Sequence, residues 1–261
     1  MVITSKDNDF VKHVKKLKEK KYREEYGEFI IEGIKMIEEA INENAKIKQI
    51  VVCEDCKNSG GIPQDLLYTI AKYECVYVSE KVFTQMTDVS NPQGILAIID
   101  KVGNKEASID FKEDLFLILD NIQDPGNMGT ILRTADSINL KQILVSKGSS
   151  DVYNPKVVRS TMGAIFRVKV IECEDLVKTV KELKKHKIKV YATDLKTDKS
   201  IYDVDYKKSA IVIGNEAHGV SNEILEVSDE RIKILMKGKT ESLNAAVATS
   251  IILYEAIRPG R

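Results

Sequence analysis

Six short runs of apolar residues in the second half of the chain alternate with segments of helical periodicity. The runs are apolar throughout rather than at every second position, which is typical of parallel strands that helices cover on both faces. We expect strands at residues 115–119, 142–145, 168–171, 189–192, 210–213 and 232–235. Apolar spacing predicts helices at 128–138, 156–164, 176–186 and 243–257. This order predicts an α/β fold with a mostly parallel sheet and helices on both faces.

The first hundred residues hold shorter elements of both kinds. Val11, Val14 and Leu17 recur at helical spacing among many lysines, which predicts one helix over residues 10–23 with a single apolar stripe. We also expect strands at 29–33, 50–53, 76–78 and 94–99, and helices at 34–41, 63–73 and 81–86. The polar stretch 101–108 indicates a linker. We therefore predict a smaller domain over residues 1–104 and a larger one over 105–261.

The last predicted helix is apolar on nearly every side over its first three turns, from Ala245 to Leu253. Such a helix is buried on more than one side. We expect one domain to cover it only in part, and the remainder to lie in an interface between two copies of the chain.

The charge balance and the length of the apolar stretches limit the classes to which this protein can belong. The 261 residues include 40 Lys and Arg and 40 Asp and Glu, so any surface that attracts nucleic acid must be local. No apolar stretch approaches the roughly 20 residues that span a bilayer. The first twenty residues are charged and lack the apolar core of a signal peptide. We expect a cytoplasmic protein.

Two of the four cysteines, Cys53 and Cys56, have CxxC spacing. A zinc site normally needs a second pair of ligands at similar spacing, which this sequence lacks. A redox pair usually opens a helix that follows a strand, and here two acidic residues separate the thiols. Reduced thiols are the alternative in a cytosolic protein. We expect no metal site.

Three polar motifs follow predicted strands of the second domain. They are residues 121–129 with Arg133 after them, residues 213–219, and residues 242–244. The carboxyl ends of parallel strands meet at one edge of a sheet, where ligands bind, so these motifs are expected to form one site. They match neither the three-glycine Rossmann pattern nor a P-loop, because Lys233 stands where the first P-loop glycine belongs.

The first motif has a structural reading and a functional one. Residues 124–127 are a tight turn by composition, and Asn127 is a candidate cap for the next helix. That reading leaves Asn121 and Arg133 unexplained. Arg133 has apolar neighbours and therefore needs an anionic partner, either a buried acid or a phosphate.

The other two motifs also leave alternatives open. Glu216 follows an apolar strand, where a carboxylate needs a partner or water. It pairs with Arg133, accepts hydrogen bonds from a sugar, or is an ordinary loop acid. Ser242 is a good N-cap for the last helix, whose free N–H groups would also favour an anion. His218 is expected to be a plain loop residue.

These three motifs, in this order and spacing, resemble those of the SpoU (TrmH) family of RNA ribose 2′-O-methyltransferases, in the SPOUT superfamily. The resemblance covers about residues 112–258. Its catalytic positions fall on Asn121, Arg133, Glu216, Ser242 and Asn244. The first domain resembles the substrate-binding domain often fused ahead of this one, with its lysine-rich helix followed by Phe29-Ile30-Ile31-Glu32-Gly33.

The resemblance implies a deep trefoil knot near the C-terminus, S-adenosyl-L-methionine bound by the knot loops, and a homodimer with its active sites at the interface. The implied cofactor-binding residues are Thr193, Gly214, Ile234, Met236, Leu243 and Asn244. Gly214 would permit close approach of the ligand to the backbone, and Ile234 and Leu243 would lie on either side of the adenine.

The implied reaction is methyl transfer to a ribose 2′-hydroxyl of structured RNA, with ribosomal RNA preferred over tRNA. A guanidinium holds its proton far above neutral pH, so Arg133 is either a base activated by a phosphate or a clamp that orients phosphate and hydroxyl. The alternatives are a tRNA ribose or tRNA base methyltransferase, and a non-catalytic RNA-binding protein of the same fold. Lys15, Lys16 and Lys20 are expected to bind RNA in a salt-sensitive manner, unless they form an ordinary solvated surface.

Overall fold

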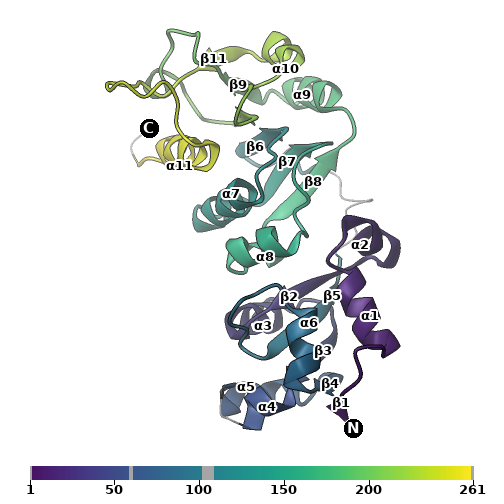
Figure 1. Cartoon of the computed structure of the whole chain (residues 1–261). Helices are drawn as coiled ribbons and strands as arrows, with labels where there is room; N and C mark the ends of the chain where they lie inside the picture. The colour runs from purple at the N-terminus through teal and green to yellow at the C-terminus, as the bar shows by residue number, and fades with distance from the viewer. Residues whose placement is uncertain (1, 59–60, 102–108, 260–261) are drawn as a thin grey trace. The chain divides into compact units, whose positions relative to one another are not determined.

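The computed structural model describes residues 2–58, 61–101 and 109–259 (Figure 1). Its contacts divide the chain into two compact units. The first unit is Met1–Gly103 with Tyr153–Phe166, and the second is Asn104–Val152 with Arg167–Arg261. Most of the predicted linker, with the boundary between residues 104 and 105, lies outside the described residues. Among the helices described, none has the length and apolar character needed to cross a membrane.

The first unit is built on a mixed five-stranded sheet of order β1-β4-β3-β5-β2. β1 and β3 run parallel to β4, whereas β5 is antiparallel to both β2 and β3. The strands are Val2–Ile3 (β1), Glu28–Glu32 (β2), Ile47–Cys53 (β3), Cys75–Val78 (β4) and Ile95–Asp100 (β5). The helices are Asp9–Lys16 (α1), Lys20–Tyr26 (α2), Ile34–Asn42 (α3), Glu54–Asn58 (α4), Gln64–Ile70 (α5), Glu80–Met86 (α6) and Pro155–Thr161 (α8).

Alternate residues of each strand in this sheet belong to different cores. Ile31 packs in a cluster with α3, α5 and Val158 of α8, whereas its neighbour Ile30 packs in a cluster with α1 and α6. Successive side chains of a strand point to opposite faces, so both faces are covered by helices. This explains why successive residues in the centre of these strands are apolar, as in Phe29–Ile31.

The single helix predicted over residues 10–23 is wrong, because the chain turns between α1 and α2. The guanidinium of buried Arg23 donates from Nη1 to the carbonyl oxygens of Leu17 (2.8 Å) and Lys18 (2.7 Å). Carbonyl groups at the end of a helix favour a cation. Arg23 therefore holds the corner between the two helices and takes no part in a basic surface.

The second unit contains a six-stranded sheet of order β11-β9-β10-β6-β7-β8, and every neighbouring pair is parallel. The strands are Leu115–Asp120 (β6), Gln142–Ser146 (β7), Lys169–Cys173 (β8), Lys189–Thr193 (β9), Ser209–Gly214 (β10) and Glu230–Ile232 (β11). The longer helices are Pro125–Ser137 (α7), Leu176–Lys185 (α9), Asn222–Val227 (α10) and Ala245–Ala256 (α11), and a short 3-10 turn is Ile201–Asp203 (η3). A further 3-10 turn, Ala164–Phe166 (η2), belongs to the first unit.

Helices cover both faces of this sheet (Figure 1). α9 and α10 pack with alternate residues of the strands, such as Ile118 and Val212. α7 and α11 pack against each other, and α11 contacts β10. The predicted parallel α/β fold is confirmed. The last strand is shifted, since β11 ends at Ile232, where the predicted strand begins.

Candidate active site at the carboxyl edge of the parallel sheet

The first two polar motifs lie side by side because β6 and β10 are neighbours in register. Asp120, at the end of β6, lies opposite Gly214, at the end of β10. One residue further on, the side-chain amide of Asn215 donates to the carbonyl oxygen of Asn121 at 2.9 Å. The predicted edge therefore brings both motifs together.

Asn121 has a left-handed backbone conformation, with φ of 64°. Asparagine is among the few residues that adopt this conformation readily. The N–H of Asn121 donates to the hydroxyl of Ser146 on β7 at 2.7 Å, and its carbonyl accepts the bond from Asn215. The backbone of Asn121 thus joins three strand ends, while its side chain is exposed.

Glu216 binds the first motif through a set of hydrogen bonds. Its carboxylate accepts from the side-chain amide of Asn127 at 2.8 Å and from the backbone N–H groups of Gln123 (3.3 Å) and Asp124 (3.2 Å). Burial by itself would raise the pKa of Glu216, but these bonds outweigh it and lower the pKa. The carboxylate is a fixed part of the site, and Arg133 is not among its hydrogen-bond partners.

Asn127 extends this network to the third motif. Its side-chain oxygen accepts from the side-chain amide of Asn244 at 2.8 Å. Asn244 in turn caps α11, where its own side-chain oxygen accepts from the N–H groups of Ala246 (2.9 Å) and Val247 (3.2 Å). Glu216, Asn127 and Asn244 therefore link all three motifs.

Two predicted caps are corrected by these contacts. The N-cap of α11 is Asn244 rather than Ser242, which stands two residues earlier and is exposed. The N-cap of α7 is Asp124, whose side chain accepts from the N–H of Asn127 at 2.8 Å. The amide of Asn127 is thereby left for the network, a role that its turn-like sequence context did not reveal.

A cavity of about 420 Å³ lies beside this network, at the ends of β9, β10 and β11. Ligand pockets typically measure roughly 300–1,000 Å³. Of the residues predicted to bind the cofactor or to act in catalysis, the walls include Thr193, Gly214, Glu216, Ile234, Met236, Ser242 and Leu243. Asn121, Arg133 and Asn244 do not line it.

Gly214 is required by the chain itself. A Cβ atom at this position would lie 2.1 Å from the backbone of Gly219 and Val220, far inside contact distance. Asn215 and Gly219 exchange two backbone hydrogen bonds of 2.9 Å, which close the loop onto the end of β10. The predicted close approach at Gly214 was that of a ligand and stays a prediction, whereas the close contact in the structure is with the backbone of this loop.

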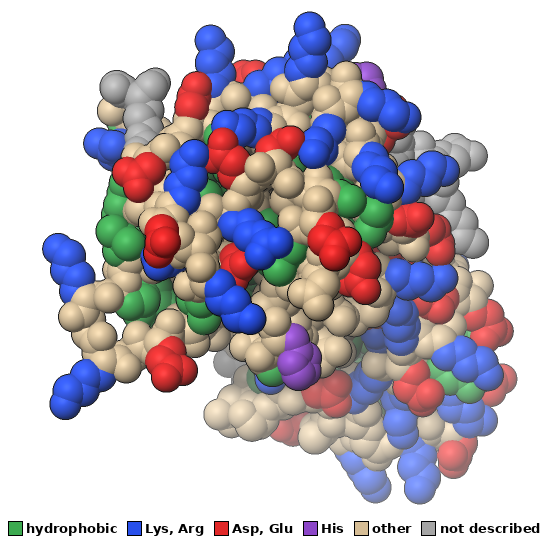
Figure 2. All heavy atoms as spheres, turned by 90° about the horizontal axis from the view of Figure 1, so that it is seen from above, with side chains coloured by type: hydrophobic (Ala, Val, Ile, Leu, Met, Phe, Trp, Pro, Cys, Tyr) green, Lys and Arg blue, Asp and Glu red, His purple; other side chains and the backbone are tan. Residues whose placement is uncertain are grey.

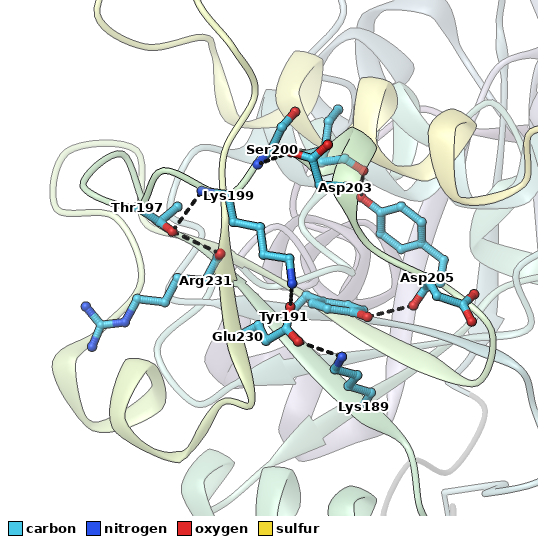
Figure 3. A network of polar contacts seen from close by, with 11 residues as sticks. Lys189, Tyr191, Thr197, Lys199, Ser200, Asp203, Asp205, Glu230 and Arg231 are labelled. Atoms are coloured by element: carbon cyan, nitrogen blue, oxygen red, sulfur yellow. Dashed lines mark hydrogen bonds and ion pairs between the residues drawn. The ribbon is translucent and has the colours of Figure 1, made fainter.

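The segment after β9 borders the cavity and is held by a polar network (Figure 3). Glu230 of β11 forms ion pairs with Lys189 (2.6 Å) and Lys199, and hydrogen bonds from these lysines lower its pKa. The hydroxyl of Thr197 donates to the carbonyl of Arg231 at 3.2 Å. The network thus fastens residues 194–200 to the sheet, and with them one wall of the cavity.

Family comparison agrees with this geometry. The SpoU rRNA Methylase family model matches residues 114–254, which is more than half of the chain. The chain belongs to the SpoU family. A second model, the MRM3-like substrate binding domain, matches residues 8–97.

Individual relatives of this SpoU protein cover nearly its whole length. It is 36% identical to the 23S rRNA (guanosine(2553)-2′-O)-methyltransferase RlmP of Bacillus subtilis over 97% of both chains. A putative RNA methyltransferase of the TrmH family from Porphyromonas gingivalis has a similar structure, with a TM-score of 0.81 and 31% identity over 96% of this chain and 97% of that one. The SpoU methyltransferase AviRb of Streptomyces viridochromogenes, in complex with AdoMet, has a TM-score of 0.85 and 25% identity over 97% of this chain and 100% of that one.

Arg133 of this SpoU protein lies on α7, two turns after the start of the helix, and is exposed. It forms no hydrogen bond or ion pair with any residue that the structure describes, so the buried acid predicted as one possible partner is not found there.

The surface around the SpoU domain carries both signs of charge. Figure 2 shows Lys and Arg side chains interspersed with Asp and Glu over the face it presents. This agrees with a net charge of zero, and attraction of an anionic partner must come from local groups.

The cysteine pair of the first unit has no ligand set around it. The described residues contain no disulfide and no cluster of three or more side chains able to hold a metal ion. Burial, together with the neighbouring Cys53, raises the pKa of Cys56 to about 12. The thiol of Cys56 therefore stays protonated at neutral pH and is a weak nucleophile.

Proposed function

We propose that this chain transfers a methyl group from S-adenosyl-L-methionine to a ribose 2′-hydroxyl of ribosomal RNA. The observation that carries the proposal is the Glu216–Asn127–Asn244 network, which joins the three SpoU motifs beside a cavity of ligand size. The predicted enzyme class, cofactor and preference for ribosomal RNA are confirmed by family membership and by the relatives named above.

The cavity suits the cofactor in its chemistry. Ile234, Met236 and Leu243 offer apolar surface for an adenine ring, while Thr193 and the loop after Gly214 offer polar groups for a ribose and an amino acid moiety. When bound, the cofactor supplies a methyl group on a positively charged sulfur. The chain's task is to hold this methyl group in line with the ribose oxygen and to keep both in that geometry.

The polar residues of the edge have separate roles in this proposal. Arg133, exposed and without a described partner, binds a substrate phosphate and orients the 2′-hydroxyl, since a guanidinium keeps its proton near neutral pH. Glu216 and Asn244 fix the loops of the second and third motifs through Asn127. Ser242 shapes the cavity wall, and Asn121 sets the turn after β6.

A homodimer completes the proposal. α11 leaves Val247, Tyr254 and Ile257 exposed, and large apolar side chains on one helix face are typical of an interface. A knotted C-terminal segment and a cytoplasmic location also remain parts of the proposal. They rest on the family resemblance.

The test combines cofactor binding with methyl transfer. S-adenosyl-L-methionine is titrated calorimetrically into the purified protein. Methyl transfer is measured on ribosomal RNA taken from cells that lack this protein. We expect the wild type to bind the cofactor and to add one 2′-O-methyl mark to the RNA. We expect Arg133→Ala to bind the cofactor but to lose methyl transfer. No cofactor binding by the wild type would favour the non-catalytic alternative.

Mapping the mark identifies the substrate. Relatives are named for guanosine 2553 and for uridine 2479 of 23S rRNA, so the equivalents of these two nucleotides are inspected first. A mark found only on tRNA, or on a base, would replace ribosomal RNA as the substrate.

A further inference from the structure

Two tyrosines of α2 form a parallel pair at the surface of the first unit. The rings of Tyr22 and Tyr26 lie one helical turn apart, with centroids 6.1 Å apart and planes inclined by 13°. Tyr26 is 36% exposed and Tyr22 is partly exposed. Neither ring belongs to the two hydrophobic clusters that fill the faces of the sheet. The pair therefore presents aromatic surface to solvent.

The position of Tyr26 is fixed from beneath by a buried polar group. Its ring contacts the ring of His13 on α1, with centroids 4.8 Å apart. The Nε2 atom of His13 lies 2.6 Å from a carboxylate oxygen of Glu28, whose side chain is only 3% exposed and also pairs with Lys48. His13 is partly exposed, but its partner Glu28 is buried, and a surface ring packed on such a hydrogen-bonded pair is held in one orientation, as a preformed binding surface requires.

Positive charge without a carboxylate partner gathers at the same rings. The ammonium groups of Lys16 and Lys21 lie 5.2 and 5.5 Å from the centroid of the Tyr22 ring, within reach of a cation–π interaction. Three other lysines, on α1, on α2 and between them, form the ion pairs Lys12–Asp9, Lys20–Glu24 and Lys18–Asp88. Lys15, Lys16 and Lys21 form no ion pair with described residues.

We propose that Tyr22, Tyr26, Lys16 and Lys21 form a site that stacks an unpaired base of the substrate RNA and binds its phosphate. A flat aromatic face with adjacent ammonium groups matches the two halves of one nucleotide, the base and the phosphate. Paired bases are already stacked inside a helix, so the site selects a looped or single-stranded segment. The proposal rests on the proposed function only in assuming that the chain binds RNA.

The proposal revises which cations of this region bind RNA. Lys20 was expected to bind RNA, but its ammonium lies 3.6 Å from the carboxylate of Glu24. Lys21, which the sequence did not single out, replaces it.

The experiment uses the full chain and two RNA probes. One is a hairpin with 2-aminopurine in a seven-nucleotide loop, and the other is a duplex of equal length. Tyr22→Leu and Tyr26→Leu remove the rings but keep apolar bulk, Tyr22→Phe keeps the ring, and Tyr68→Leu alters a 73% exposed tyrosine of α5 as a matched control. Thermal melting checks that each variant is folded.

We expect each ring deletion to weaken hairpin binding about tenfold and to remove the quenching of 2-aminopurine. Duplex binding, and hairpin binding by Tyr22→Phe and Tyr68→Leu, should stay at the wild-type level. Lys16→Gln and Lys21→Gln should each reduce the salt slope of hairpin binding by about one.

The outcomes separate this proposal from the proposed function. Wild-type hairpin affinity in both ring deletions would overturn the stacking site, and methyl transfer by the same proteins would leave the proposed function standing. An equal loss of duplex binding would also overturn it, and would point to a general basic surface. Failure of the wild type to bind either RNA would overturn both. Unchanged cofactor binding in the ring deletions is the expected sign that the second unit is intact.

Discussion

Asn127 occupies the central position of the polar edge. It is buried, donates to the carboxylate of Glu216 and accepts from the amide of Asn244, so it uses both ends of its amide group. A side chain that joins two loops from distant parts of the sequence sets the distance between them. The geometry of the second and third motifs therefore depends on a residue of the first.

Asn127→Ala should lower methyl transfer by about tenfold to a hundredfold, since a hydrogen bond to a charged group contributes roughly 1.5–3 kcal/mol. It should also raise the pKa of Glu216, because the bond from Asn127 is the main group opposing the effect of burial. Single-turnover kinetics and carboxyl NMR titration measure the two effects. Gln123→Ala is the control, since Gln123 contributes only its backbone N–H to Glu216. Equal rates in both variants would show that the network is dispensable.

Gly214→Ala should destabilise the second unit by about 1–3 kcal/mol, the usual cost of overpacking. The added methyl group would lie 2.1 Å from backbone atoms of Gly219 and Val220, so this part of the loop would have to shift. We expect a lower melting temperature and weaker cofactor binding by calorimetry. Gly238→Ala is the matched control, because nothing lies within 4 Å of a Cβ there. A Gly214→Ala protein that melts like the wild type would contradict the close packing.

The elements were predictable where burial alone decides them. The central strands of the second unit have long apolar runs, such as Leu115–Leu119 of β6 and Ala210–Ile213 of β10. β6, β7, β9 and β10 begin and end within one residue of the predicted bounds. The break between α1 and α2 was not predictable, because it depends on Arg23 reaching the carbonyls of Leu17 and Lys18. Periodicity reports which face of a helix is buried, and it carries no information on a side chain that binds the helix end.

The same limit applies to the candidate site. Strand ends predicted that the three motifs share one edge, but the choice of Asn244 over Ser242 as the cap of α11 depends on backbone direction. The part played by Asn127 depends on the contact between two loops. The spacing of residue types along the sequence predicts neither the cap of α11 nor the contacts of Asn127.

Glu230→Gln should loosen the segment that follows β9. The carboxylate has a lowered pKa, chiefly because Lys189 and Lys199 donate hydrogen bonds to it. A lowered pKa means that the pairing stabilises the fold above the ordinary value of 4.5 and is lost as the pH falls through the folded-state value. The pairs are partly exposed, so we expect a loss of about 1 kcal/mol or less at pH 7.

Urea unfolding at neutral and acid pH measures this contribution. The difference between Glu230→Gln and the wild type should be present at pH 7 and should shrink as the pH falls below 4.5 and Glu230 takes up a proton in the folded state. Glu226→Gln on α10 is the control, since the exposed Glu226 forms no ion pair with described residues. A difference that does not shrink at any pH below 4.5 at which the protein still folds would exclude the ion pairs as its cause.

In the whole molecule, one segment is grouped in space with a different unit from the one that surrounds it in the sequence. Residues 153–166 follow two strands of the second unit in the chain, yet they are grouped with the first unit, where Val158 joins the cluster around α3 and α5. A composition break cannot reveal such an exchange, because the segment has an ordinary amphipathic sequence. A knot is likewise a property of the chain path and leaves no trace in periodicity.

The exposed face of α11 predicts the oligomeric state. Val247, Tyr254 and Ile257 are 48%, 53% and 45% exposed. Val247 and Tyr254 are seven positions apart in α11 and therefore lie on the same side of the helix. A symmetric dimer would place this face against its own copy. We therefore expect a dimer of the 29.3 kDa chain in solution.

Val247→Lys and Tyr254→Lys should convert this dimer to a monomer, because each places a charge in the apolar face of both copies. Light scattering coupled to size exclusion measures the mass, and Tyr68→Lys, on α5 of the first unit, is the control. If the active site needs residues of both copies, methyl transfer should fall together with dimerisation at each protein concentration. A wild-type protein that stays at 29.3 kDa at micromolar concentration would contradict the dimer. Monomeric variants with full activity would instead place the complete site within one chain.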